Sequence, residues 1–299
     1  MALLKEVVSV TQPAIFPRID SSLALRFGYD AATRSTILSE SSCEPPLRVV
    51  RAFVQADGAA LVHLHNVSGG LLSGDRLSLV VRVDENAKVQ LTTTGATRIY
   101  RAREEAGPAA QRTEIGIGPN AFLEYLPDQI IPYACSRFSQ RTTLELAPGA
   151  GLFWWEILAP GREAHGELFA YDFVELKADL RAEGRLLARD RVRLEPRKYP
   201  VASSARLGSY RYWATFYICR VGLRAGVWLE LEDRLREVAR ELTSSCETRW
   251  GISTLTANGL ACRCVAMRGR DVLFGLHQLW RSAKLALYGT EAVPPRKVN

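Results

Sequence analysis

A turn with the same small-residue character recurs along the first two thirds of this chain. Each copy has Asp, Asn or Gly at the turn, then a small residue, then an apolar residue two positions later. Because Asn and Gly adopt the positive φ angles of tight turns, a recurrence at roughly thirty residues predicts a repeated β unit. The copies are Asp57-Gly58-Ala59 before Leu61, Asn86-Ala87 before Val89, Asn120-Ala121 before Leu123, and Gly149-Ala150 before Leu152.

The residues before three of these turns alternate between apolar and polar, which is the period of a half-buried strand. The apolar pairs are Val81 and Val83, Ile115 and Ile117, and Leu144 and Leu146. We therefore predict a mainly β protein, in which stacked β-hairpins form a layered or helical β-sheet structure. This β-rich scaffold domain is expected to span residues 1–205. No βαβ pattern occurs, which argues against a nucleotide-binding α/β fold.

Residues 206–299 have a different pattern and are expected to form a small α+β part with two helices. A helix with one apolar face is expected from Leu229, because apolar residues recur there at helical spacing. A hairpin turning at Asn258-Gly259 should follow, and then a second helix that stops at Gly289.

The composition favours a soluble cytoplasmic protein. The net charge of +7 suggests acidic partners, but no long run of basic residues marks a nucleic-acid arm. The six cysteines are too few for a disulfide scaffold, and no segment approaches the ~20 apolar residues of a membrane span. Cys262 and Cys264 lie two apart in a strand pattern, where a core position fits better than a zinc site without a second pair.

The segment GGLLSGD contains three glycines, Gly69, Gly70 and Gly74, and ends on Asp75. It is not a phosphate-binding loop, because it lacks the Gly-Lys-Ser/Thr ending and leads into a strand rather than a helix. We interpret it as a structural loop.

Five blocks of sequence in a fixed order resemble the urease accessory protein D family, called H in some organisms. The blocks are LHNVSGGLLSGDRLSLVVRV, QLTTTGATRIYRA, NAFLEYLPDQIIPY, LAPGAGLFWWEILAPGREAHGE, and LWRSAKLALYG with PPRK. The resemblance implies a non-catalytic scaffold in urease maturation. It would bind the urease apoprotein and the F-type accessory protein, and through the latter the G-type GTPase, in a hetero-oligomer without nucleic acid or membrane.

The resemblance also implies that nickel crosses the protein by an internal, water-filled route, with Ni²⁺ bound only transiently and no cofactor held tightly. Asp75, Glu124 and Glu156 are then candidate lining residues. From the residues themselves, an ionised carboxylate in an apolar strand is costly unless it is paired, hydrated or metal-bound. The alternative is that the strand turns each glutamate toward solvent or toward an arginine such as Arg98 or Arg101.

Other side chains extend the list of candidate ligands. His165 and Glu167, taken with Asp75, offer the oxygen and imidazole ligands that suit transient Ni²⁺. His63 and His65 alternate on a strand and therefore face one side together, as a possible metal pair.

The second C-terminal helix presents Leu276, Leu279 and Trp280 on one apolar face, which is either buried in this chain or used for a partner. The basic tail after it contains Pro294, Pro295 and Arg296. We expect this end of the chain to dock on the F-type partner.

Two other functions stay open on the sequence. A polysaccharide-acting enzyme of the β-helix kind could use Glu156 and Glu167 as paired carboxylates. A basic nucleic-acid-binding module could use exposed arginines with one aromatic ring as a stacking surface. Those residues are Arg98, Arg101, Arg103 and Tyr100.

Overall fold

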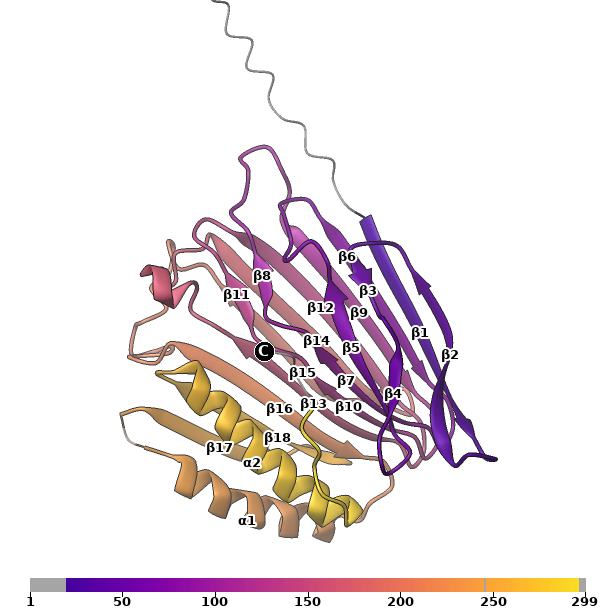
Figure 1. Cartoon of the computed structure of the whole chain (residues 1–299). Helices are drawn as coiled ribbons and strands as arrows, with labels where there is room; N and C mark the ends of the chain where they lie inside the picture. Colours follow the sequence, from indigo (N-terminus) through magenta and orange to yellow (C-terminus); the bar gives the residue numbers. More distant parts are fainter. Residues whose placement is uncertain (1–19, 245, 296–299) are drawn as a thin grey trace, which may run out of the picture.

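Two β-sheets lie face to face in the computed structural model, which describes residues 20–244 and 246–295 (Figure 1). The seven-stranded sheet has the order β15-β14-β12-β9-β6-β1-β2. Its strands are β1 (Asp20–Asp30), β2 (Ser35–Cys43), β6 (Arg76–Val83), β9 (Ala109–Ile117), β12 (Arg137–Leu146), β14 (Phe173–Ala182) and β15 (Arg185–Leu194).

The eleven-stranded sheet has the main order β17-β18-β16-β13-β10-β7-β5-β3, with β4, β8 and β11 pairing beside it. Its N-terminal members are β3 (Leu47–Arg48), β4 (Ala52–Val54), β5 (Ala60–Asn66), β7 (Lys88–Thr93), β8 (Thr97–Ile99) and β10 (Phe122–Leu126). The others are β11 (Ile130–Pro132), β13 (Gly151–Leu158), β16 (Tyr212–Arg220), β17 (Thr248–Thr254) and β18 (Gly259–Ala266).

The prediction of a mainly β chain is confirmed. The turn at Asp57-Gly58 closes the antiparallel pair β4 and β5, whereas the turns at Asn86, Asn120 and Gly149 join strands of different sheets. The turn at Asn86 leads from β6 in one sheet to β7 in the other, and the turn at Asn120 leads from β9 to β10 in the same way. Both residues have positive φ, 62° and 53°, which permits the sharp corner. Neighbouring strands are therefore parallel, β6 with β9 and β7 with β10, so that the chain coils through both sheets.

The corners themselves stack on one another. The backbone N–H of Asn86 donates to the carbonyl of Pro119 at 3.0 Å, and the N–H of Asn120 donates to the carbonyl of Pro148 at 3.1 Å. These bonds satisfy backbone groups that a bend leaves unpaired, and they hold successive turns of the coil in register.

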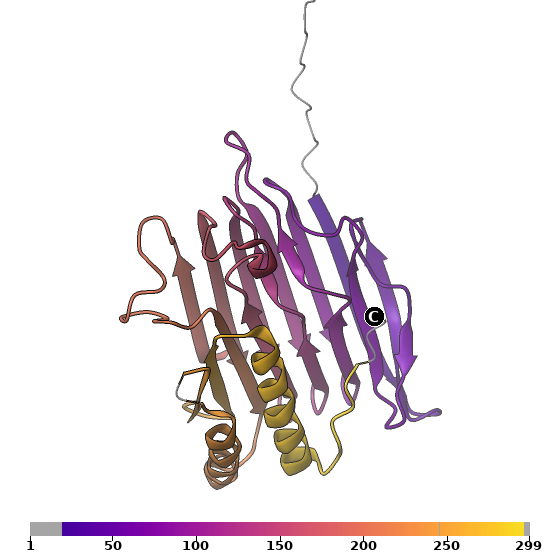
Figure 2. The ribbon, with the colours of Figure 1, turned by 60° about the vertical axis from the view of Figure 1, so that its left-hand side comes forward.

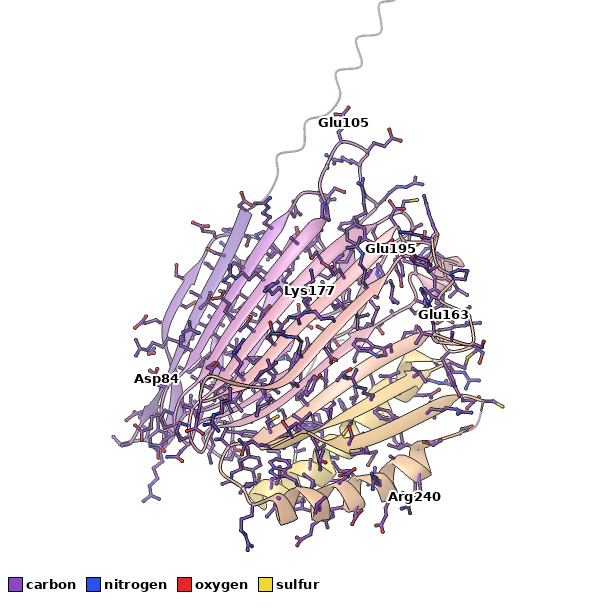
Figure 3. The ribbon with its side chains drawn as sticks, turned by 180° about the vertical axis from the view of Figure 1, so that it is seen from behind. Asp84, Glu105, Glu163, Lys177, Glu195 and Arg240 are labelled. Atoms are coloured by element: carbon purple, nitrogen blue, oxygen red, sulfur yellow. The ribbon has the colours of Figure 1, made fainter. Side chains whose placement is uncertain are left out.

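The molecule has two main hydrophobic cores, one on each face of the eleven-stranded sheet. The first fills the space between the sheets with apolar side chains such as Phe27, Leu123 and Trp154. The second lies between the opposite face and the helices, and it includes Phe153, Phe216 and Trp280. The outer face of the seven-stranded sheet is charged and carries ion pairs such as Lys177 with Glu175 at 2.8 Å (Figure 3).

The two predicted C-terminal helices are present as α1 (Ala225–Leu242) and α2 (Gly269–Tyr288), and a 3₁₀ turn, η1 (Glu163–His165), precedes β14. Both helices lie on the outer side of the eleven-stranded sheet (Figure 2). Strand β16 pairs antiparallel with β13 and with β18, so the C-terminal strands extend the same sheet. The division at residue 205 falls in the connection between β15 and β16 and stays a prediction.

The C-terminal hairpin and its two cysteines lie as the sequence predicts. The predicted hairpin turn at Asn258 joins β17 to β18 as an antiparallel pair. Cys262 and Cys264 are buried in the core under the helices, where burial raises the pKa of both thiols. Neither of the described helices is long and apolar enough to cross a membrane.

Candidate functional site

Glu156 lies on β13 and borders a cavity between the two sheets. Along this strand Trp154 joins the inter-sheet core, whereas Trp155 and Ile157 join the core under the helices. Strand alternation therefore turns Glu156 toward the space between the sheets. The cavity has a volume of about 270 Å³, which is room for several water molecules at roughly 30 Å³ each.

The cavity exists because the opposite sheet presents polar side chains at positions that are apolar elsewhere. In β12 the inward positions begin with Phe138, continue with Gln140 and Thr142, and return to apolar at Leu144. Gln111 on β9 lines the same space. Further polar residues border the cavity, namely His65, Asn66, Thr93, Thr94, Thr97, Arg98 and Asp128.

Among the residues that the structure describes, Glu156 has one hydrogen-bond donor and no paired cation. The Nε2 amide of Gln140 donates to its Oε1, and among the described residues no Lys, Arg or His forms an ion pair with it. Burial, together with the field of Asp190, raises the pKa of Glu156 to about 7, against the opposing effect of the Gln140 bond. The side chain is half-buried because it meets the cavity. It can therefore exchange a proton near neutral pH, and in its ionised form it can bind a cation.

Glu124 lies on the neighbouring strand β10 but on the opposite face of the sheet. Its side chain is 3% exposed and forms an ion pair with Lys284 of α2 at 2.9 Å. Trp280 Nε1 and Gln90 Nε2 donate to the same carboxylate at 2.6 and 3.2 Å. Burial raises the pKa of Glu124, while Lys284 and Trp280 act in the opposite direction. The carboxylate faces neither solvent nor the arginines Arg98 and Arg101.

Asp75 closes the glycine-rich loop. Its carboxylate accepts the backbone N–H of Leu72 at 2.8 Å, and the residue is 2% exposed. Gly69 and Gly74 have positive φ, and a Cβ on Gly70 would lie 2.5 Å from the carbonyl oxygen of Arg98. The loop geometry thus requires these glycines, and Gly69 and Gly70 border the Glu156 cavity.

His165 and Glu167 lie near η1, away from the other candidates. His165 is exposed. Glu167 accepts hydrogen bonds from Arg162 and from the backbone N–H of Ala134, and these bonds lower its pKa. Within residues 20–244 and 246–295, no group of three or more His, Cys, Asp or Glu side chains is arranged to hold a metal ion. The structure therefore does not gather Asp75, Glu124, Glu156, His165 and Glu167 into one site.

His63 and His65 face one side of β5, and their proximity contributes to a lowered pKa of His65, after the larger effect of burial. His65 borders the Glu156 cavity. Only this histidine of the predicted pair therefore joins the same space as Glu156.

The predicted partner-binding face of α2 is buried in this chain. Leu276, Leu279 and Trp280 each have 0% exposure, because α2 packs on the eleven-stranded sheet with this face. The isolated chain therefore does not offer them to a partner. The exposed apolar side chains of α2 are instead Leu273, Phe274 and Leu285, at 36%, 61% and 52%.

The tail leaves α2 and runs back over the sheet. Gln90 Nε2 donates to the carbonyl of Val293 at 3.1 Å. Pro294 is exposed and Pro295 is half-buried, so this segment lies at the surface. Arg296, which was predicted to bind a partner, lies outside the described residues.

The residues of the two alternative functions are arranged less favourably. Arg98, Arg101 and Arg103 are exposed, and the last two belong to the projecting loop with Glu105 (Figure 3). Tyr100 packs edge-on against Tyr133 with ring centroids 5.3 Å apart, which occupies part of the proposed stacking surface. The carboxylates proposed for hydrolysis have separate partners, since Glu156 contacts Gln140 and Glu167 pairs with Arg162.

Sequence reasoning missed the residues that make the cavity. Gln140 and Thr142 occupy inward positions of β12, and a polar pair within an alternating apolar strand is a signal that could have identified them. The effect of Asp190 on the pKa of Glu156 leaves no such signal in the sequence, because it depends on which strands face each other.

Comparison with known proteins supports the family resemblance that the five sequence blocks carry. A model of the family described as UreD urease accessory protein matches residues 21–299. A urease accessory protein UreD of Herpetosiphon aurantiacus is 44% identical over 281 residues, which are 94% of this chain and 97% of the relative. Relatives of the same name from Pseudomonas aeruginosa and Staphylococcus aureus are 35% and 31% identical, over 84% and 75% of this chain and 85% and 79% of their own lengths.

Proposed function

This chain belongs to the UreD family of urease accessory proteins, and we propose that it serves urease maturation as a non-catalytic scaffold that passes Ni²⁺ through its interior. The nickel ion is cargo, not a resident cofactor. The scaffold would bind the urease apoprotein and the F-type accessory protein, and would reach the G-type GTPase through the latter.

The observation that carries the proposal is the unpaired carboxyl of Glu156 in a polar cavity between the sheets. A carboxylate, an imidazole from His65 and several amide and hydroxyl oxygens surround room for water. Such ligands suit Ni²⁺, and their small number favours rapid exchange over tight binding. With its raised pKa, Glu156 can release a proton when the ion arrives and regain it when the ion leaves.

Of the other candidate residues, Asp75 supports the loop that borders the cavity, and Glu124 holds α2 on the sheet. We therefore propose that Glu156 is the main carboxylate of the nickel passage and that Glu124 has a structural role. His165 and Glu167 lie at the surface near η1, where they could receive or release the ion.

The experiment compares a host with and without this protein at limiting nickel. Deletion should leave the urease polypeptide present but nickel-poor and inactive, and the plasmid-borne gene should restore activity. Full urease activity in the deletion strain at low nickel would end the proposal. The six free cysteines suit a reducing cytoplasm as the place of the reaction.

We also propose that the end of the chain, with Pro294, Pro295 and Arg296, docks on the F-type partner. Truncation after Gly289 removes this segment but keeps the buried face of α2. The truncated chain should stay soluble and should lose most of the F-type partner in a pull-down. Undiminished co-purification would show that the tail is not the docking segment.

A further inference from the structure

Four cationic side chains form a line across the outer face of the seven-stranded sheet, which we call the cationic row. Arg112 on β9 is directly opposite Arg141 on β12, and Arg141 is directly opposite Lys177 on β14. Arg191 on β15 completes the cationic row, directly opposite Lys177. Residues opposite one another share a face of a sheet, so all four point to the same side. Lys177 marks their place near the middle of this face (Figure 3).

The cationic row is unfavourable for a sheet that only has to fold. Like charges directly opposite one another on neighbouring strands destabilise a sheet, and the cationic row contains three such contacts in succession. Two residues away on the same face, the charge changes sign, at Glu114 on β9 and at Glu175 and Asp179 on β14. The four cations are therefore aligned with one another, while carboxylates border them.

Arg141, inside the cationic row, has its donors available. It is exposed, and its side chain forms no hydrogen bond or ion pair with the described residues. The other three members each have a carboxylate beside them: Arg112 pairs with Glu114, Lys177 with Glu175, and Arg191 with Asp179. A guanidinium has five N–H donors, so an arginine that holds one carboxylate can still donate to another.

A groove of about 430 Å³ lies at the Arg112 end of the cationic row. Short side chains and arginines share its lining: Ser78, Ala110, Ser139, Arg76, Arg112 and Arg141. Two carboxylates, Asp20 and Glu44, also line it on the side of β1 and β2. Arg76 is exposed and, like Arg141, has no side-chain partner within the described part of the chain. The short side chains leave room for acidic groups of a partner to reach the arginines.

We propose that the cationic row is a docking site for an acidic helix of a partner protein, with carboxylates in one stripe at positions i, i+3, i+7 and i+10. Four cations in steps of about 4.8 Å span roughly 14 Å. Ten residues of helix, at a rise of about 1.5 Å each, span roughly 15 Å. A strand with four carboxylates on one face needs six steps of about 3.3 Å, or roughly 20 Å, and so fits the cationic row less well.

A nucleic-acid backbone also matches this face less well than an acidic helix does. Phosphates follow a nucleic-acid strand at every nucleotide, so a duplex laid here would bring negative charge over more than one row. It would then meet Glu114 on one side, and Glu175 and Asp179 on β14. A helix with a single acidic stripe places its charge on the cationic row alone.

This docking site does not depend on the proposed function. The cationic row lies on the opposite face of the seven-stranded sheet from the Glu156 cavity, and both described helices cover the other sheet (Figure 2). A partner bound to the cationic row therefore leaves α2 and the tail after it accessible. The net charge of +7 adds a general attraction for acidic partners, which the experiment must separate from docking at this row.

The test measures binding of a labelled peptide to the full chain by fluorescence anisotropy. The probe is a synthetic helix of alanine and glutamine with four glutamates in the proposed stripe. A second peptide has the same composition, with the glutamates spread around the helix. The striped peptide should bind at least fivefold more tightly than the second one. Arg141→Gln should weaken its binding at least fivefold, and Arg112→Gln with Arg141→Gln at least twentyfold.

The matched control is Arg234→Gln. Arg234 is exposed on α1, so its replacement removes the same charge from another face of the molecule. Binding of the striped peptide should then fall less than twofold. Thermal melts that coincide with that of the native chain establish that each variant is folded, as expected for changes at exposed positions.

Two results would overturn the docking site. Equal binding of the two peptides, or equal losses with Arg141→Gln and Arg234→Gln, would mean that net charge alone attracts the probe. Tighter binding of a roughly 12-nucleotide DNA single strand than of the striped peptide, with the same sensitivity to Arg141→Gln, would assign the cationic row to nucleic acid instead.

Discussion

Glu124 and Glu156 lie on adjacent strands of one sheet, yet their surroundings differ in kind. Glu124 faces α2, from which Lys284 and Trp280 donate to it, and Gln90 of β7 donates to the same carboxylate. Glu156 faces the space between the sheets, where a single amide donates to it and a cavity takes the remaining room. A carboxylate in an apolar strand can therefore be part of the framework or part of a binding space. The presence of a buried cation decides which.

The largest effect on stability is expected from replacing Glu124. Glu124→Gln leaves the buried ammonium of Lys284 without its counter-charge, which should lower the free energy of unfolding by about 3–5 kcal/mol. Denaturant unfolding of the purified chain measures it. The matched control is Glu175→Gln on the outer face, whose carboxylate pairs with Lys177 and Arg193, and it should cost less than about 1 kcal/mol.

A double variant tests whether Glu124 and Lys284 act as a pair. Glu124→Met combined with Lys284→Met removes both charges together, so the stability should recover most of what either single change loses. Additive losses in the double variant would mean that the two side chains do not act as a pair, and that Glu124 has another role.

Replacing Glu156 is expected to change the free energy of unfolding in the opposite direction, toward higher stability. Its pKa in the folded state, about 7, is above the unfolded value near 4.5, so the folded state holds the proton more tightly. The stability of the native chain should therefore fall as pH rises from about 4.5 to 7 and stay lower above that. Glu156→Gln removes this loss and should raise the free energy of unfolding at pH 8 by about 3 kcal/mol, with little change at pH 4.5. A destabilised variant at pH 8 would instead indicate an unrecognised cationic partner.

The smallest effect concerns the one donor to Glu156. Gln140→Leu removes a hydrogen bond to the charged carboxylate, so it should cost about 1 kcal/mol at pH 8 and less at pH 5, where Glu156 is protonated. Parallel urea titrations at the two pH values measure the difference. An equal cost at both would show that Gln140 stabilises the fold by packing alone.

The sequence predicted what depends on local pattern. Strands were visible from alternation such as Ile115 and Ile117, and α2 from its apolar face and the stop at Gly289. The path of the chain was not visible, because Asn120 with positive φ suits a hairpin and a corner between sheets equally well.

The site was less predictable for the same reason. Glu124 and Glu156 look alike in sequence, and the residue that distinguishes them, Lys284, is 160 positions away from Glu124. In its own helix Lys284 looks like any surface lysine. The cavity likewise depends on Gln140 of one sheet facing Glu156 of the other, a pairing that only the coil of parallel strands creates.

The central claim is that Glu156 handles cargo while Glu124 holds the fold, and urease activation tests it most directly. Purified apo-urease with its accessory proteins is supplied with limiting Ni²⁺ and either native chain, Glu156→Gln or the control Glu175→Gln. The account predicts that the Glu156→Gln complex assembles normally, yet its urease gains activity and bound nickel at least threefold more slowly than with the control. Activation at the native rate by a fully assembled Glu156→Gln complex would contradict it.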